Sequence, residues 1–103
     1  MEFHPSQVPV AKTFEIGDVE SAALAAEEMV EMGFEGRKDG FKVLMPKEKR
    51  LAKRIGYAVT TGVTAGLGRT GQKRDIRYWT YHEDDEHYAI VLVGAGVFNE
   101  LGL

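Results

Sequence analysis

Apolar and acidic positions alternate at helical spacing between Asp18 and Gly33. Asp18 is a good N-cap, and Gly33 suits the left-handed conformation that ends many helices. Four glutamates occupy one side of the segment, and the opposite, apolar side consists of Val19, Ala22, Ala23, Ala26, Met29 and Val30. Upstream, residues 12–16 alternate loosely and indicate a strand. This part of the chain therefore predicts a strand followed by an amphipathic helix.

A second helix is predicted to begin at Pro46, because proline is tolerated in the first turn of a helix, where its missing N–H would be unpaired anyway. Its buried stripe consists of Leu51, Ile55, Ala58 and Val59. Each glycine inside a helix costs about 1 kcal/mol relative to alanine, so the later glycines favour a flexible loop over residues 62–71. The alternative is a helix that continues toward residue 67, in which Gly62 and Gly66 allow close packing with another helix or another chain.

The Asp39-Gly40 pair predicts a first hairpin. Asp-Gly is among the strongest short turn signals, and here it separates residues 34–37 from residues 41–45. The first of these runs follows directly after the glycine that ends the first helix. We therefore expect two antiparallel strands between the two helices.

A second hairpin is predicted near the end of the sequence. Residues 75–82 and 87–93 are rich in aromatic and β-branched side chains, and the wholly acidic run 83–86 separates them. With that run as the loop, Trp79 would face Ile90 across the two strands. The remaining tail is too short for a further element.

The resulting order is β-α-β-β-α-β-β, which predicts an α+β domain. A length of 103 residues fits one domain, residues 1–103, with residues 1–11 as an extended or flexible lead-in. Two βαβ-like passes with both helices on one face indicate a two-layer ferredoxin-like sandwich with one extra strand and a mainly antiparallel sheet.

Composition and motifs exclude several kinds of chemistry. The chain has no cysteine, which excludes disulfides, thiolate metal sites and thiol nucleophiles. It has no phosphate-binding Gly-Lys-Ser/Thr motif, no HExxH motif and no Ser-His-Asp order, so we expect a non-catalytic protein without a cofactor. No stretch has the length of a membrane span, and the beginning lacks the pattern of a secretory signal. The expectation is a cytoplasmic protein without a membrane partner.

The formal net charge of −3 conceals a basic middle segment. Residues 47–77 carry nine basic and two acidic side chains, whereas residues 78–103 carry five acidic side chains and no lysine or arginine. A basic helix beside a glycine-rich segment predicts a site for a phosphate-bearing polyanion, RNA or DNA. The predicted phosphate contacts are Lys49, Arg50, Lys53, Arg54, Arg69, Lys73, Arg74 and Arg77, and the predicted base-stacking residues are Trp79 and Tyr81.

Three other interpretations of these residues stay open. In the first, the basic helix face is only solvated, and Trp79 and Tyr81 belong to the core. In the second, the chain forms a homo-oligomer through a sheet edge or through the surface of small residues on the second helix. In the third, His82 and His87, which would face each other across the second hairpin, bind a divalent metal together with the carboxylates of the loop.

Overall fold

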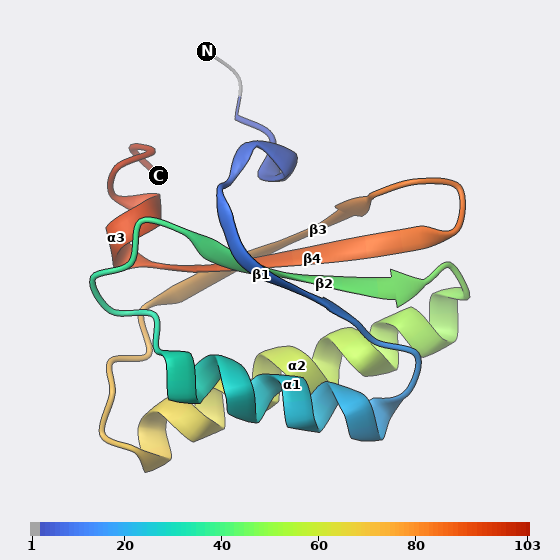
Figure 1. Ribbon diagram of the computed structural model, residues 1–103, viewed down its shortest axis with the longest axis horizontal. Helices are drawn as coiled ribbons and strands as arrows, with labels where there is room; N and C mark the ends of the chain where they lie inside the picture. Colours follow the sequence, from blue (N-terminus) through green and yellow to red (C-terminus); the bar gives the residue numbers. More distant parts are fainter. Residues whose placement is uncertain (1–2) are drawn as a thin grey trace.

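One mixed sheet with two helices on one face forms the body of the protein (Figure 1). The structure, a computed structural model, describes residues 3–103. Along the chain the elements are a 3-10 turn η1 (Pro5–Gln7), β1 (Val10–Glu15), α1 (Val19–Met32), β2 (Gly40–Pro46), α2 (Lys49–Arg69), β3 (Ile76–His82), β4 (His87–Gly94) and α3 (Ala95–Phe98). The predicted α+β class is confirmed.

The strands lie in the order β1-β2-β4-β3. β1 runs parallel to β2, and β4 runs antiparallel to both β2 and β3. Each of the helices α1 and α2 therefore connects two parallel strands, but the second connection leaves β4 between β2 and β3. The sheet has four strands rather than five and is mixed, with two antiparallel pairs and one parallel pair, and the ferredoxin-like strand order is not confirmed.

Helix α1 has the boundaries that its capping residues predict. The backbone N–H of Ser21 donates to the Asp18 carboxylate at 2.7 Å, and Gly33 ends the helix with a φ of 81°. Its buried side consists of Ala22, Ala25, Ala26, Met29 and Val30. The buried stripe is therefore rotated slightly from the predicted one, which included Ala23 instead of Ala25.

The first predicted hairpin is wrong, because residues 34–39 form a loop and only β2 is a strand. Phe34 turns into the core instead: it is 3% exposed, and its ring centre lies 5.1 Å from that of Phe41. β2 pairs with β1 on one side and with β4 on the other, so neither of its edges is free for the predicted partner strand. Gly40 opens β2 at a close approach, since a Cβ there would lie 2.6 Å from a carbonyl oxygen of β4.

Helix α2 starts later and ends later than predicted. Pro46 ends β2 and does not open the helix. Glu48 is the N-cap, and its carboxylate accepts a hydrogen bond from the backbone N–H of Leu51 at 2.8 Å. The predicted flexible loop over residues 62–71 is wrong, because the helix continues to Arg69.

Contact with α1 explains why the glycines of α2 remain helical. A Cβ on Gly62 would lie 2.9 Å from the Cβ of Ala26. A Cβ on Gly66 would lie 2.7 Å from Cγ2 of Val30. The missing side chains let the two helices approach closely, and the packing gained outweighs the cost in helix propensity. Since α1 of the same chain occupies this small-residue surface, the prediction that a second chain packs on it is wrong.

The second predicted hairpin is confirmed, with a register one residue away from the expected one. Trp79 lies opposite Val91 rather than Ile90. The backbone N–H of Glu83 donates to the carbonyl oxygen of His87 at 3.0 Å, so Glu83 pairs with His87 and only residues 84–86 of the acidic run form the loop. A one-residue shift in an antiparallel pair changes every cross-strand partner.

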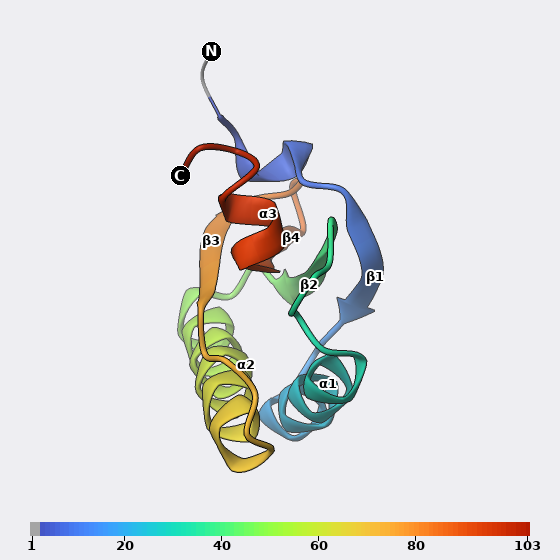
Figure 2. The same ribbon diagram turned by 90° about the vertical axis from the view of Figure 1, so that its left-hand side faces the viewer.

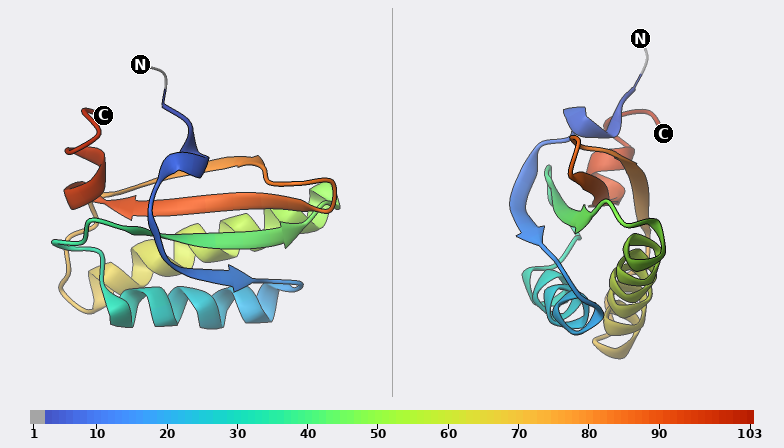
Figure 3. Two further views of the ribbon diagram at one scale, coloured as in Figure 1. Left: turned by 45° about the horizontal axis from the view of Figure 1, so that its top comes forward. Right: turned by 90° about the vertical axis from the view of Figure 1, so that its right-hand side faces the viewer.

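The two ends of the described chain cover the other face of the sheet, as two further views show (Figure 3). A second, smaller core there consists of Val8, Val91, Val93 and Val97. The lead-in is folded from Phe3 onward, because the Phe3 ring packs 5.0 Å from that of Trp79. The tail forms α3, which was not predicted. No helix in residues 3–103 combines the length and the apolar character needed to cross a membrane.

Candidate functional site

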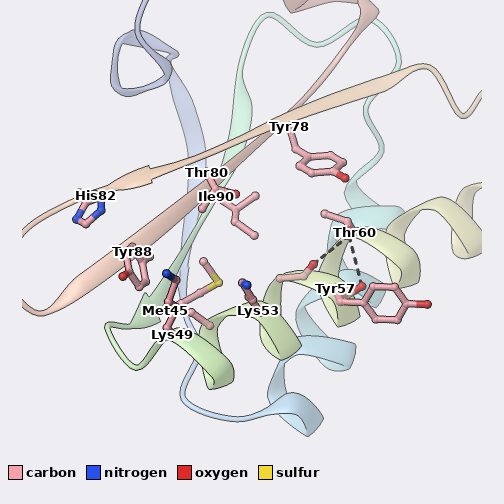
Figure 4. A pocket seen from close by; sticks show the side chains of 12 residues that line it. Met45, Lys49, Lys53, Tyr57, Thr60, Tyr78, Thr80, His82, Tyr88 and Ile90 are labelled. Carbon is pink, nitrogen blue, oxygen red and sulfur yellow. Dashed lines mark hydrogen bonds between the residues drawn. The ribbon is translucent and has the colours of Figure 1, made fainter.

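A groove of about 490 Å³ runs between α2 and the edge strand β3 (Figure 4). Helix α2 contributes Lys49, Ala52, Lys53, Gly56, Tyr57 and Thr60. The sheet contributes Tyr78, Thr80 and His82 from β3, together with Met45, Tyr88 and Ile90 from β2 and β4. The lining therefore combines an apolar floor with three tyrosines, two lysines and one histidine.

Residue spacing on the two elements builds this groove. Lys49, Lys53 and Tyr57 follow one another at four-residue intervals, so they project from the same side of α2. On β3 every second residue faces the helix layer, which brings Tyr78 and His82 into the groove. Seen along the sheet, α2 lies beside the β3 edge and α1 lies beside the β1 edge (Figure 2).

Aromatic surface in the groove is unusually accessible. The side chains of Tyr57 and Tyr78 are 73% and 52% exposed. The third ring, that of Tyr88, is partly buried and meets the imidazole of His82 edge to face, with 4.9 Å between ring centres. The two exposed rings offer flat apolar surfaces to a ligand, and their hydroxyl groups remain at the polar rim.

Positive charge gathers in the first two turns of α2. Lys49, Arg50, Lys53 and Arg54 lie there, and residues 49–69 include no acidic side chain. A helix dipole disfavours cations at this end by about 0.3–1 kcal/mol each, so helix stability does not explain their position. Within the described part of the chain, none of the four takes part in an ion pair.

The structure divides the predicted phosphate contacts into separate groups. Lys49 and Lys53 line the groove, and Arg50 and Arg54 are exposed on the adjoining surface of α2. A second group lies around the other end of the helix, about 22 Å beyond the first group at 1.5 Å per residue. This second group consists of Arg69, Lys73 and Arg74.

The remaining predicted residues, Arg77, Trp79 and Tyr81, face the opposite side of the sheet. The guanidinium carbon of Arg77 lies 4.3 Å from the centre of the Phe98 ring. Trp79 packs against Phe3. The expected stacking of these side chains beside the cations of α2 is therefore not possible in one groove.

Sequence reasoning missed the tyrosines that do lie with the lysines. One signal was present, because Tyr57 continues the four-residue series of Lys49 and Lys53 along α2. On β3, strand alternation separates Tyr78 from Trp79, but alternation alone does not say which of the two faces the helix layer. That choice depends on where α2 packs.

His82 and His87 lie on opposite faces of the sheet. His82 meets Tyr88 on the helix side, whereas the Nδ1–H of His87 donates to the Asp84 carboxylate at 3.0 Å. This hydrogen bond raises the pKa of His87. Over residues 3–103, no three or more histidine, aspartate or glutamate side chains gather in a way that could hold a metal ion. The structure therefore does not bring the two histidines of the predicted metal site together.

His82 is the only histidine in the lining of the groove, and no carboxylate of the described residues lines it. The groove does offer cations, hydroxyl groups and aromatic rings. Comparison of the chain with protein-family models, curated proteins and solved structures finds no match in any of the three.

Proposed function

We propose that the protein is a non-catalytic binding module that holds single-stranded RNA or DNA in the groove between α2 and β3. One observation carries the proposal: Lys49 and Lys53 share a groove with the exposed rings of Tyr57 and Tyr78, and no acidic side chain of the described residues lines it. The lysines bind backbone phosphates, and the tyrosines stack on bases.

The physical chemistry of single strands supports this function. Such strands bind where a positively charged groove follows the backbone and aromatic rings stack on successive bases, each stack being worth about 1–3 kcal/mol. Arg50 and Arg54 extend the positive surface beside the groove. Since the protein as a whole has a net charge of −3, the local cluster of cations on α2 attracts phosphate to this surface and orients the ligand.

Fluorescence anisotropy with labelled single-stranded RNA and DNA over a range of salt concentrations tests the proposal. The wild type should bind with an affinity that falls as salt rises. The double variant Lys49→Gln/Lys53→Gln should bind about tenfold more weakly, and its salt slope should fall by about 1.4, because each phosphate contact to a single strand contributes about 0.7 to the slope.

The matched control is Lys12→Gln/Lys38→Gln, which removes the same charge from residues outside the groove. This control should bind like the wild type. Equal weakening by the two double variants would contradict a site in the groove, and a wild type without salt-sensitive binding would contradict the function. Tyr57→Ala should weaken binding by loss of stacking while leaving the salt slope unchanged.

A further inference from the structure

The outer edge of β3 is unpaired in the described chain. β3 is the last strand of the sheet, so only one of its sides is hydrogen-bonded to a neighbour. The hydrogen bond from the Glu83 N–H to the His87 carbonyl oxygen sets the alternation along the β3–β4 pair. By that alternation the backbone groups of Tyr78, Thr80 and His82 point away from β4.

β3 also lacks the features that protect sheet edges, which include prolines, outward lysines and bulges. The opposite edge has them: the register of β1 is irregular between Val10 and Lys12, and Lys12 forms an ion pair with Glu28. β3 pairs with β4 without interruption and contains no proline. Its one lysine or arginine, Arg77, is held over the Phe98 ring on the face away from α2.

The two ends of β3 carry opposite charges. Lys73 and Arg74 precede the strand, and the acidic run 83–86 follows it. When two β3 strands pair antiparallel, the start of one lies beside the end of the other. The basic start of each copy then meets the acidic end of the second copy, and a two-fold axis makes the contact twice.

If the two-fold axis passes through Trp79, at the centre of β3, the whole strand pairs with the same strand of the second copy. This axis sets Tyr78 opposite the partner's Thr80 and Ile76 opposite the partner's His82. These residues belong to the outward-pointing series, so their backbone groups meet along the new strand pair, except for the N–H of Ile76, which donates to the carbonyl oxygen of Arg74 at 2.9 Å in its own chain. No other symmetric register pairs the full length of β3 with itself.

The same register also determines which charged residues of the two copies lie opposite each other. Lys73, whose Nζ also lies 3.8 Å from the Glu35 carboxylate of its own chain, lies opposite the partner's Asp85 and forms an attractive pair with it. One like-charged pair arises, between Asp75 and the partner's Glu83. The Glu83 carboxylate is already compensated in its own chain, because Lys42 Nζ donates to it at 2.9 Å.

We propose that the protein forms a symmetric dimer in which the β3 strands of two copies pair antiparallel about Trp79 and join two four-stranded sheets into one. This inference goes beyond the proposed function and does not rest on it. In the dimer the two α2 helices lie on the same face of the joined sheet, on either side of the axis. The two grooves consequently open toward each other.

Sedimentation equilibrium of the full chain without nucleic acid tests the dimer. The wild type should show the mass of two chains. Thr80→Pro removes an outward N–H and takes no hydrogen bond from β4, so it should weaken dimerisation by at least about tenfold. Thr80→Ala keeps the N–H and should dimerise like the wild type.

A charge exchange tests the register. Lys73→Glu/Arg74→Glu makes both ends of β3 acidic, whereas Asp85→Lys/Glu86→Lys removes the net negative charge of the turn and sets a lysine opposite the partner's Lys73 while sparing the Asp84 hydrogen bonds. Each double variant alone should dimerise more weakly than the wild type, because each replaces the attractive pair at Lys73 with a like-charged pair. Mixed in equal amounts, the two should form a heterodimer, because both contacts are then complementary.

Two results overturn the inference: a single-chain mass for the wild type at every soluble concentration, or a dimer that Thr80→Pro and both charge reversals leave intact. Circular dichroism and thermal unfolding establish that each variant is folded. Nucleic-acid binding is measured separately on the same samples. A monomeric wild type that still binds single strands would overturn the dimer alone, and a dimer that binds none would overturn the function alone.

Discussion

The two β-α-β connections of this protein differ in what lies between their strands. In the first, β1 and β2 are neighbours, and the rings of Phe14, Phe34 and Phe41 pack into one cluster in the core. In the second, β4 separates β2 from β3, and the corresponding aromatic residue of the edge strand, Tyr78, is half exposed. Within the described residues, the helix of the first connection covers its strands without a groove, whereas a groove remains between α2 and β3 in the second connection.

Close packing of the helices accounts for this difference. Gly62 and Gly66 let α2 lie tightly against α1, which limits how far α2 extends across β3. β3 is one strand spacing, about 4.8 Å, further out than it would be in an unsplit connection. α2 therefore stops short of covering β3. The two glycines therefore lower the helix propensity of α2 but allow it to pack closely on α1, and this packing leaves the groove open on the other side of α2.

Truncating one aromatic residue in each connection should give the largest contrast. Phe41 is fully buried, so Phe41→Ala should lower the free energy of unfolding by about 3–5 kcal/mol. Tyr78→Ala removes a half-exposed ring and should lower it by less than about 1 kcal/mol. Urea unfolding at neutral pH measures both values. Similar losses would show that the second connection is as tightly packed as the first.

Filling the contact between the helices should have a smaller effect. Gly66→Leu forces a side chain against Val30 and should lower the free energy of unfolding by about 1–3 kcal/mol, despite the better helix propensity of leucine. Ala65→Leu adds the same side chain to the exposed neighbouring position and should change it by less than about 0.5 kcal/mol. If both substitutions were tolerated equally in urea unfolding, close packing would not explain the path of α2.

The smallest expected effect concerns the pair that ties the end of β3 to β2. The hydrogen bond from Lys42 lowers the pKa of Glu83 from its ordinary 4.5. A carboxyl group whose pKa is lower in the folded chain stabilises the fold at pH values above its pKa in the unfolded chain. This contribution is lost as the pH falls through its pKa in the folded chain. Since both side chains are partly exposed, Glu83→Gln should cost less than about 1 kcal/mol at neutral pH.

Thermal unfolding across the acid range measures this pH dependence. The gap between wild type and Glu83→Gln should narrow as pH falls below the ordinary glutamate pKa, and it should close once Glu83 is protonated in the folded chain as well as in the unfolded chain. A gap that stays constant down to acid pH would mean that the substitution acts through packing and not through charge.

The sequence by itself determined the α+β class, the limits of α1 and the existence of the β3–β4 hairpin. Those signals are local: the Asp18 cap, the Gly33 end and the alternating residues of the strands act within a few positions. It also located the cations of the candidate site, because Lys49 and Lys53 lie close together along the chain.

Only the tertiary structure decided the length of α2, the strand order and the face on which each aromatic residue of β3 lies. Helix α2 runs past its glycines because Ala26 and Val30, far away in the sequence, pack against them. Tyr78 rather than Trp79 faces the lysines because α2 packs on that side of the sheet. Each of these outcomes is a contact between segments distant along the chain, and short-range patterns carry no information on which surfaces such segments present to each other.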